Sequence, residues 1–121
     1  MVLRTVLFTA FLVLLATSSA PAQQDVDVRD LAQNPAGHYG KVVTVNGTIA
    51  GYQTRVTGRG TPYASFRLKE GDVSVTVFAG RPKGLRNDQH VRVTGKFAKL
   101  KRVGRDTFRN AVEAYRVVVL R

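Results

Sequence analysis

The 121-residue sequence contains no cysteine. Disulfide bonds, a cysteine-ligated zinc ion and a lipid-modified cysteine behind an export signal are therefore all excluded. Histidine occurs only as His38 and His90, at a spacing that fits no metal-ligand motif. Acidic residues number only eight, and Glu70 and Asp72 share a segment with the composition of a turn. We therefore expect a protein that is not an enzyme and that holds no metal and no cofactor.

Long apolar runs are also missing, apart from one near the start of the sequence. Val6–Ala16 is apolar, but a membrane-spanning helix needs roughly 20 such residues. Arg4 precedes this run and small residues follow it at positions 20–22, which is the pattern of a secretory signal peptide. We predict a signal peptide over residues 1–22, export to the periplasm or the extracellular space, and no stable membrane insertion after cleavage. A retained N-terminal anchor is the alternative.

Basic residues, by contrast, are abundant. Lysine and arginine total 19 against 8 acidic residues, a net charge of +11. Residues 1–22 hold one of these cations, so the predicted mature chain keeps 18. Such an excess predicts a polyanionic partner: nucleic acid, acidic lipid or acidic glycan. The simpler alternative is that the charge only keeps an exported protein soluble.

The clearest local pattern is the segment 63–78, YASFRLKEGDVSVTVF. Apolar residues occupy alternate positions on both sides of a glycine-containing turn at 70–72, which is typical of a half-buried β-hairpin. The other face combines two aromatic, two basic and three hydroxyl-bearing side chains, and we expect it to point outward and to carry the function. The residues predicted to face the core are Ala64, Phe66, Leu68, Val73, Val75 and Val77.

Further alternation predicts strands over 41–52, 90–97 and 110–120. In the first of these strands Tyr52 is expected to face outward. Gly47, on its inward face, is expected to mark a bulge or tight bend that lets one strand serve both halves of a small barrel. Residues 53–62 and the lysine- and arginine-rich stretch around Gly104 are predicted to be loops. The expected inward residues are Val43, Val45, Gly47, Ile49, Val91, Val93, Gly95, Phe97, Val112, Ala114 and 117–120.

A short helix is expected before the strands. Asp27 can cap a helix over 28–33 in which Leu31 is the apolar anchor, and Pro35 ends it because the residue before a proline avoids helical geometry. We therefore divide the chain into the signal peptide, an N-terminal strap over 23–40 and a barrel over 41–121. We expect this unit to be a monomer.

The pattern VVTVNGTIAGY, then YASFRLKEGDVSVTVF, LRNDQHVRVTGKF and NAVEAYRVV resembles the OB-fold nucleic-acid-binding domain of the tRNA-anticodon-binding type. The resemblance extends over most of 41–118. It implies an all-β fold, a small five-stranded antiparallel Greek-key barrel, here preceded by the short helix. It also implies a ligand-binding face on the second and third strands, flanked by the loops between strands one and two and strands four and five.

Transferred to this sequence, the face comprises Tyr63, Ser65, Arg67, Lys69, Thr76 and Phe78 on the strands, and Arg55, Arg59, Lys99, Lys101, Arg102 and Arg105 in the loops. Tyr63 and Phe78 are candidates for stacking on bases, with Tyr52 as a third. The cations would follow a phosphate backbone. The alternative for the two aromatic residues is that they close the barrel or pack under the strap, and the alternative for the basic loop is a solvated surface.

Three functions remain open on these grounds. The first is a non-catalytic module that binds single-stranded nucleic acid or another polyanion. The second is a periplasmic interaction or stress protein, similar to small periplasmic OB barrels, with a protein or small-molecule partner. The third is a secreted nuclease similar to the staphylococcal type, which the lack of a carboxylate cluster disfavours.

Overall fold

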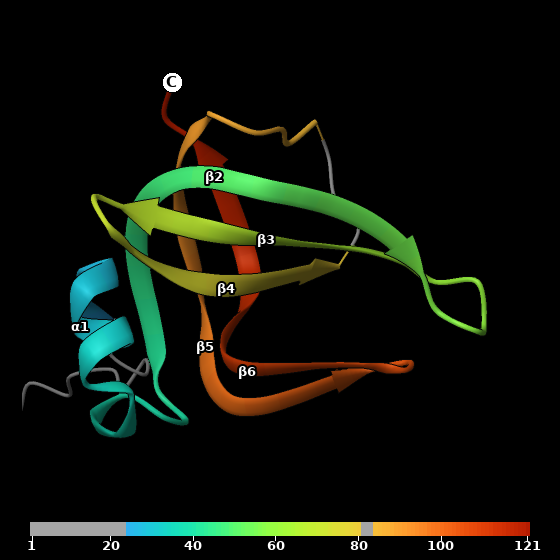
Figure 1. Ribbon diagram of the computed structural model, residues 1–121, viewed down its shortest axis with the longest axis horizontal. Coiled ribbons are helices and arrows are strands. Elements are labelled where there is room, and N and C mark those ends of the chain that lie inside the picture. Colours follow the sequence, from blue (N-terminus) through green and yellow to red (C-terminus); the bar gives the residue numbers. More distant parts are fainter. Residues whose placement is uncertain (1–23, 81–83) are drawn as a thin grey trace, which may run out of the picture.

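The computed structural model describes residues 24–80 and 84–121 (Figure 1). The predicted signal peptide lies outside these residues. No helix within the described ranges has the length and apolarity to cross a membrane. The elements in chain order are β1 (Gln24–Asp25), α1 (Val28–Gln33), the 3-10 helix η1 (Pro35–Gly37), β2 (Val42–Val56), β3 (Pro62–Glu70), β4 (Val73–Gly80), β5 (His90–Val103) and β6 (Asp106–Val119).

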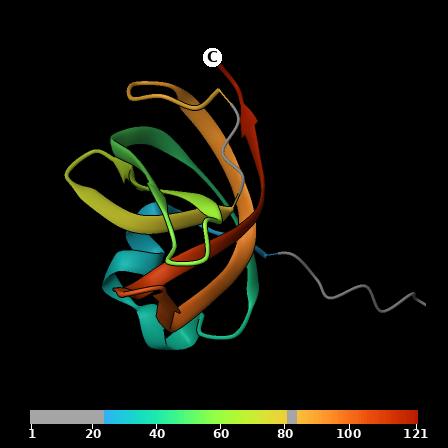
Figure 2. The same cartoon turned by 90° about the vertical axis from the view of Figure 1, so that its right-hand side faces the viewer.

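The five long strands close into a barrel (Figures 1 and 2). Around the barrel β2 pairs with β3, β3 with β4, β4 with β6, β6 with β5, and β5 again with β2. These pairings are antiparallel except that of β4 with β6, which is parallel over 76–79 and 111–114. The predicted small five-stranded barrel is confirmed. The short β1, which runs parallel to the start of β2, was not expected.

Strand β2 belongs to both halves of the barrel, as predicted. Its first half pairs with β5 and its second half with β3, and the two pairings meet at Thr48. Next to this point, a side chain on Gly47 would come within 2.8 Å of both Leu68 and the Lys69 carbonyl, so glycine permits the close approach. The bulge itself lies further along, between Ala50 and Gln53, where Gly51 has a φ of +61°. Of the bulge or tight bend expected at Gly47, the bulge is therefore wrong in position, whereas the change of partner strand does occur next to Gly47.

The core lies inside the barrel and under α1. The predicted inward residues of the 63–78 hairpin and of the strands that begin near 41 and 90 are confirmed as buried, with Val73 only half-buried. Val28 and Leu31 of α1 add to this core, which confirms Leu31 as the anchor of the strap. Asp27 stands at the helix N-cap but makes no side-chain capping bond. The Val28 N–H instead donates to the Glu70 carboxylate at 3.2 Å, which ties the helix to the β3–β4 turn.

Three strand boundaries differ from the prediction. β2 continues to Val56, and β5 and β6 form one long hairpin that pairs as far as Val103 and Asp106, where loops were expected. Lysine and arginine at exposed strand positions resemble a loop in the sequence, because both are solvated. The expected inward placement of 117–120 holds only for Val117, which is half-buried and packs against the core. Val118, Val119 and Leu120 lie beyond the end of the β4–β6 pairing and are 40%, 45% and 36% exposed.

Candidate nucleic-acid interface

Two hairpins extend to the same side of the barrel (Figure 1). One ends in the loop 57–61 between β2 and β3, and the other in the turn at 104–105 between β5 and β6. Their ends lie close together, since a Cβ atom added to Gly104 would lie 3.9 Å from the Thr57 backbone and both ends line one hollow. We call the outward surface of β3 and β4, together with the loop 57–61 and the end of the β5–β6 hairpin that flank it, the groove face. The sequence predicted this strand face and both flanking segments as the binding surface.

A row of three aromatic rings crosses the groove face. Tyr63 of β3, Phe78 of β4 and Phe108 of β6 stand with ring centroids 5.4 Å and 6.0 Å apart, at interplanar angles of 44° and 37°. These are favourable spacings for aromatic pairs. Phe78 and Phe108 are half-buried. The sequence pattern did not single out Phe108, because its place opposite Lys101 follows only from the β5–β6 hairpin, and 98–109 resembles a loop in the sequence.

Tyr63 is the anchor of this row and is not a free stacking surface. It is only 4% exposed, and its hydroxyl donates to the Asp106 carboxylate. That hydrogen bond raises the pKa of Tyr63, with smaller contributions from burial and from the Asp106 charge, while Arg55 acts in the opposite direction. Arg55 also forms an ion pair with Asp106 at 3.5 Å. The prediction that Tyr63 is exposed for base stacking is therefore wrong, because the β5–β6 hairpin folds over it.

Lys101 stands over the centre of the row. Its Nζ lies 5.7 Å from the Phe78 ring centroid and 2.5 Å from a Glu113 carboxylate oxygen. Lys101 and Glu113 are each about one-third exposed, at 32% and 31%. The cation is therefore held on the aromatic ring by a carboxylate, in a position that a ligand can reach from solvent.

Two hollows open on the groove face. One, of about 340 Å³, lies between the hairpin ends and is lined in part by Arg55, Arg105 and Asp106. The other, of about 190 Å³, lies over the middle of β3 and is lined by Gly51, Gln53, Ser65, Phe66, Arg67 and Thr76. Gly51 leaves this hollow open, since a side chain there would approach the Arg67 guanidinium to 3.7 Å.

The β2 bulge decides which side chains of this strand reach the groove face. Before the bulge, odd-numbered residues of β2 face the core. After it, Gln53 and Arg55 stand opposite Ser65 and Tyr63 and so face outward. Tyr52 is thereby turned to the other side, where its ring stacks on Phe66 at 6.2 Å and burial raises its pKa. The prediction that Tyr52 lies on the outward face is wrong for this reason.

The other predicted residues divide between the groove face and its surroundings. Ser65, Arg67, Thr76 and Phe78 lie on it, Arg59 is exposed in the flanking loop, and Lys69 is exposed at the far end of β3 near the turn. Lys99 is exposed on β5, on the same side of the strand as Lys101 by alternation. Arg102 points to the opposite side of the β5–β6 hairpin, because it neighbours Lys101 in a strand and pairs with Thr107. Its predicted place among the binding residues is not supported.

Potential metal ligands do not gather at this surface. Over residues 24–80 and 84–121, no group of three or more histidine, aspartate or glutamate side chains is arranged to hold a metal ion. The groove face therefore offers aromatic rings, hydroxyls and cations as its means of recognition.

Comparison with protein-family models and with curated sequences finds no match. Similar folds occur among solved structures. The crystal structure of yeast Stn1 and Ten1 aligns with a TM-score of 0.65 and 7% sequence identity, over 87% of this chain and 66% of that chain. A putative aspartyl-tRNA synthetase from Leishmania major Friedlin aligns with a TM-score of 0.59 and 14% identity, over 90% of this chain and 23% of that chain.

At such low identity these similarities concern the fold alone. Together with the closed five-strand barrel and its short N-terminal helix, they establish an OB-fold. The five OB strands are β2, β3, β4, β5 and β6. The groove face then corresponds to the surface of the second and third strands through which this fold commonly binds oligonucleotides.

Proposed function

We propose that the protein is a non-catalytic OB-fold module that binds single-stranded nucleic acid, or a related polyanion, on the groove face. The observation that carries the proposal is the half-buried Phe78 ring, which lies between Tyr63 and Phe108 under the Lys101 ammonium group. A fixed aromatic ring beside a cation is the combination that a stacked base and its phosphate require.

Stacking supplies the part of the affinity that charge alone does not. Each base that stacks on an aromatic side chain adds about 1–3 kcal/mol, with little dependence on sequence. Tyr63 is buried, but it holds Phe78 at a fixed tilt. Phe78 and Phe108 are half-buried, so part of each ring remains exposed for a base. We expect one or two stacked bases on this row.

Charge supplies the rest of the binding affinity. Arg59, Arg67, Lys99 and Arg105 are exposed around the row, and among the residues described here none of the four forms an ion pair. Each cation that meets a phosphate releases a counterion, so the affinity should fall steeply as salt rises.

The setting of this activity is part of the proposal. The sequence pattern of 1–22 supports export to the periplasm or the extracellular space, and the polyanion would then be met outside the cytoplasm. We propose that the protein acts there as a monomer and without catalysis.

Fluorescence anisotropy with a labelled single-stranded oligonucleotide tests the proposal, with duplex DNA and heparin as competitors and salt as the variable. We expect salt-dependent binding for which the single strand competes better than heparin. Equal competition by heparin would reduce the surface to a generic polyanion site, and absence of binding at low salt would refute the proposal.

Variants locate the binding site. Arg67→Ala combined with Lys101→Ala should weaken binding and make its salt dependence shallower, by about 0.7 in log–log slope for each phosphate that is no longer neutralised. The matched control is Lys41→Ala with Arg86→Ala, which removes the same charge at two exposed positions outside the groove face. Equal effects from both pairs would show that net charge, and not the groove face, determines the affinity.

A further inference from the structure

A further polar cavity lies on another part of the barrel surface, away from the aromatic row. It has a volume of about 620 Å³ and is bounded by β2, β5 and β6 on one side and by the N-terminal segment 25–27 on the other. This volume is within the range of about 300–1,000 Å³ that is typical of small-ligand sites. None of the residues that line it belongs to the groove face.

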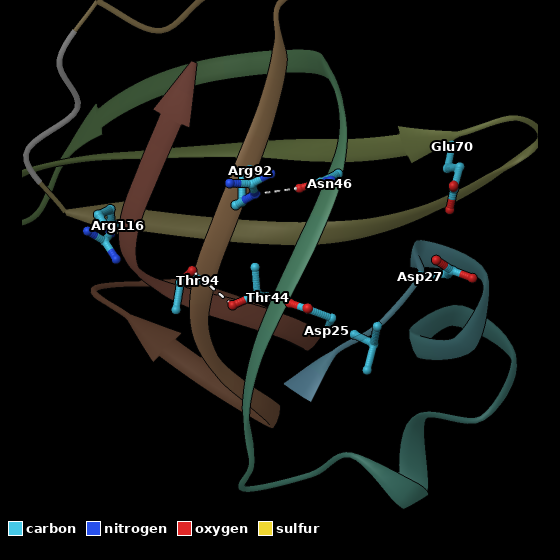
Figure 3. A pocket seen from close by; sticks show the side chains of 9 residues that line it. Asp25, Asp27, Thr44, Asn46, Glu70, Arg92, Thr94 and Arg116 are labelled. Carbon is cyan, nitrogen blue, oxygen red and sulfur yellow. Dashed lines mark hydrogen bonds between the residues drawn. The ribbon is translucent and has the colours of Figure 1, made fainter. Parts of the chain in front are cut away.

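Charges of opposite sign stand at the two ends of this cavity (Figure 3). Asp25, Asp27 and Glu70 gather on the side of the N-terminal segment and of the start of α1, whereas Arg92 and Arg116 lie over β5 and β6. The strand pairings explain why the acidic and basic residues lie at opposite ends. Asp25 is paired with Thr44, Thr44 with Thr94, and Thr94 with Arg116, so these four residues form one row across four strands.

The two threonines separate the opposite charges. Their hydroxyls lie 3.1 Å apart and cover the middle of the row, and Thr94 is 8% exposed although it is on the outward side of the sheet. Arg92 donates to the Asn46 side-chain carbonyl at 3.2 Å, which holds its guanidinium against β2. Within residues 24–80 and 84–121, neither arginine forms an ion pair with an acidic residue of the cavity. The cavity therefore keeps both signs of charge available.

The distance across the row determines what can bridge it. Neighbouring strands lie about 4.8 Å apart. The backbone of β1, which carries Asp25, is then about 14 Å from that of β6, which carries Arg116, whereas the Arg92 guanidinium is held nearer, against β2. The ammonium and carboxylate groups of a free amino acid are attached to one carbon atom and cannot span this distance. An extended chain of three or four residues can, since each residue adds about 3.3–3.6 Å.

We propose that this cavity is a binding site for short peptides with free termini. The ammonium group of the peptide lies against Asp25 and Asp27, its carboxylate lies against Arg92 and Arg116, and its amide groups meet Thr44, Thr94 and Asn46. Because recognition depends on the termini and on the backbone, the site accepts different side chains. This proposal goes beyond nucleic-acid binding and does not depend on it.

Nuclear magnetic resonance titration of the isotope-labelled protein with trialanine tests the proposal. We expect saturable shifts of the amide signals of Thr44, Asn46, Arg92 and Thr94. N-acetyl-trialanine, trialanine amide and free alanine should each bind at least tenfold more weakly. Equal binding of the capped peptides, or shifts confined to other residues, would overturn the proposal. Equal shifts with inorganic phosphate would also overturn it and would leave a simple anion site.

Two variants and one control complete the test. Asp25→Asn and Arg116→Gln should each weaken trialanine binding at least tenfold, while Arg86→Gln, at an exposed position outside the cavity, should not. If a variant does not fold, the comparison of free with capped peptides on the unaltered protein still tests whether the cavity binds peptide termini. Oligonucleotide binding should be unchanged in Asp25→Asn, so the two proposals can fail separately.

Discussion

Glu113 is the residue whose removal should improve the proposed activity. Its carboxylate lies 2.5 Å from Lys101, the cation over Phe78, and so occupies a position that a phosphate oxygen of the ligand would take. In the free protein Glu113 neutralises Lys101, and in a complex it would repel the incoming phosphate. The variant Glu113→Gln keeps the shape of the side chain and removes its charge.

The size of the effect follows from the partial exposure of this pair. Two unit charges 4 Å apart interact by about 1 kcal/mol in water and by about 4 kcal/mol near a protein surface. Because about one-third of each side chain is exposed, we expect a gain of about 1–2 kcal/mol, or roughly 5- to 30-fold in affinity. The loss in folding stability should stay within about 1 kcal/mol, as for other exposed ion pairs.

The assay is fluorescence anisotropy with a single-stranded oligonucleotide at several salt concentrations. Asp72→Asn is the matched control, since it changes the net charge equally at the β3–β4 turn, where Asp72 is 85% exposed and paired with Arg29. Screening beyond about 8–10 Å should leave its affinity close to that of the unaltered protein. An affinity of Glu113→Gln that is unchanged or lower, or a gain that Asp72→Asn reproduces, would refute the placement of a phosphate at Lys101.

Two predictions concern the scaffold of the groove face. Tyr63→Phe removes the hydrogen bond to Asp106 and should cost about 1.5 kcal/mol of unfolding free energy near neutral pH. Because the folded state raises the pKa of Tyr63, its contribution is complete below pH 10 and is lost as the pH rises through the raised pKa, so the difference between the two proteins in denaturant titrations should shrink above pH 10. A difference that does not change with pH would contradict this assignment. Gly95→Ala places a Cβ atom far inside van der Waals distance of the Glu113 carbonyl oxygen, at the register shift of the β5–β6 hairpin. The variant should lose about 3 kcal/mol or more of unfolding free energy, measured by thermal or chemical unfolding. A melting temperature equal to that of the unaltered protein would show that the hairpin can move apart at no cost.

The parts of the fold that the sequence predicted correctly are those set by local alternation. Residues 63–78 fold as the expected hairpin, and Val28–Gln33 as the expected helix, because both patterns are complete within a few residues and their turns carry glycine or proline. The outward position of Ser65, Arg67 and Phe78 follows from the same alternation.

The incorrect predictions concern residues whose orientation or strand pairing is set by strands distant in the sequence. The bulge at Gly51 turns Tyr52 inward and Arg55 outward, and alternation along β2 alone cannot show it, because a bulge is defined by the partner strand. The basic stretch after Phe97 was expected to be a loop, because its charged residues resemble a solvated segment. In the structure it pairs with 106–111, which brings Phe108 to the aromatic row.

The sequence by itself thus determined the strand-rich fold, the inward residues of its central hairpin and the excess of basic charge. Only the tertiary structure decided that Tyr63 is a buried support, that Glu113 and Asp106 hold two of the cations, and that opposite charges face each other across Thr44 and Thr94. The physical reason is the separation along the chain of the residues that interact. Alternation depends on neighbours along the chain, whereas burial and charge pairing depend on which strands barrel closure brings together.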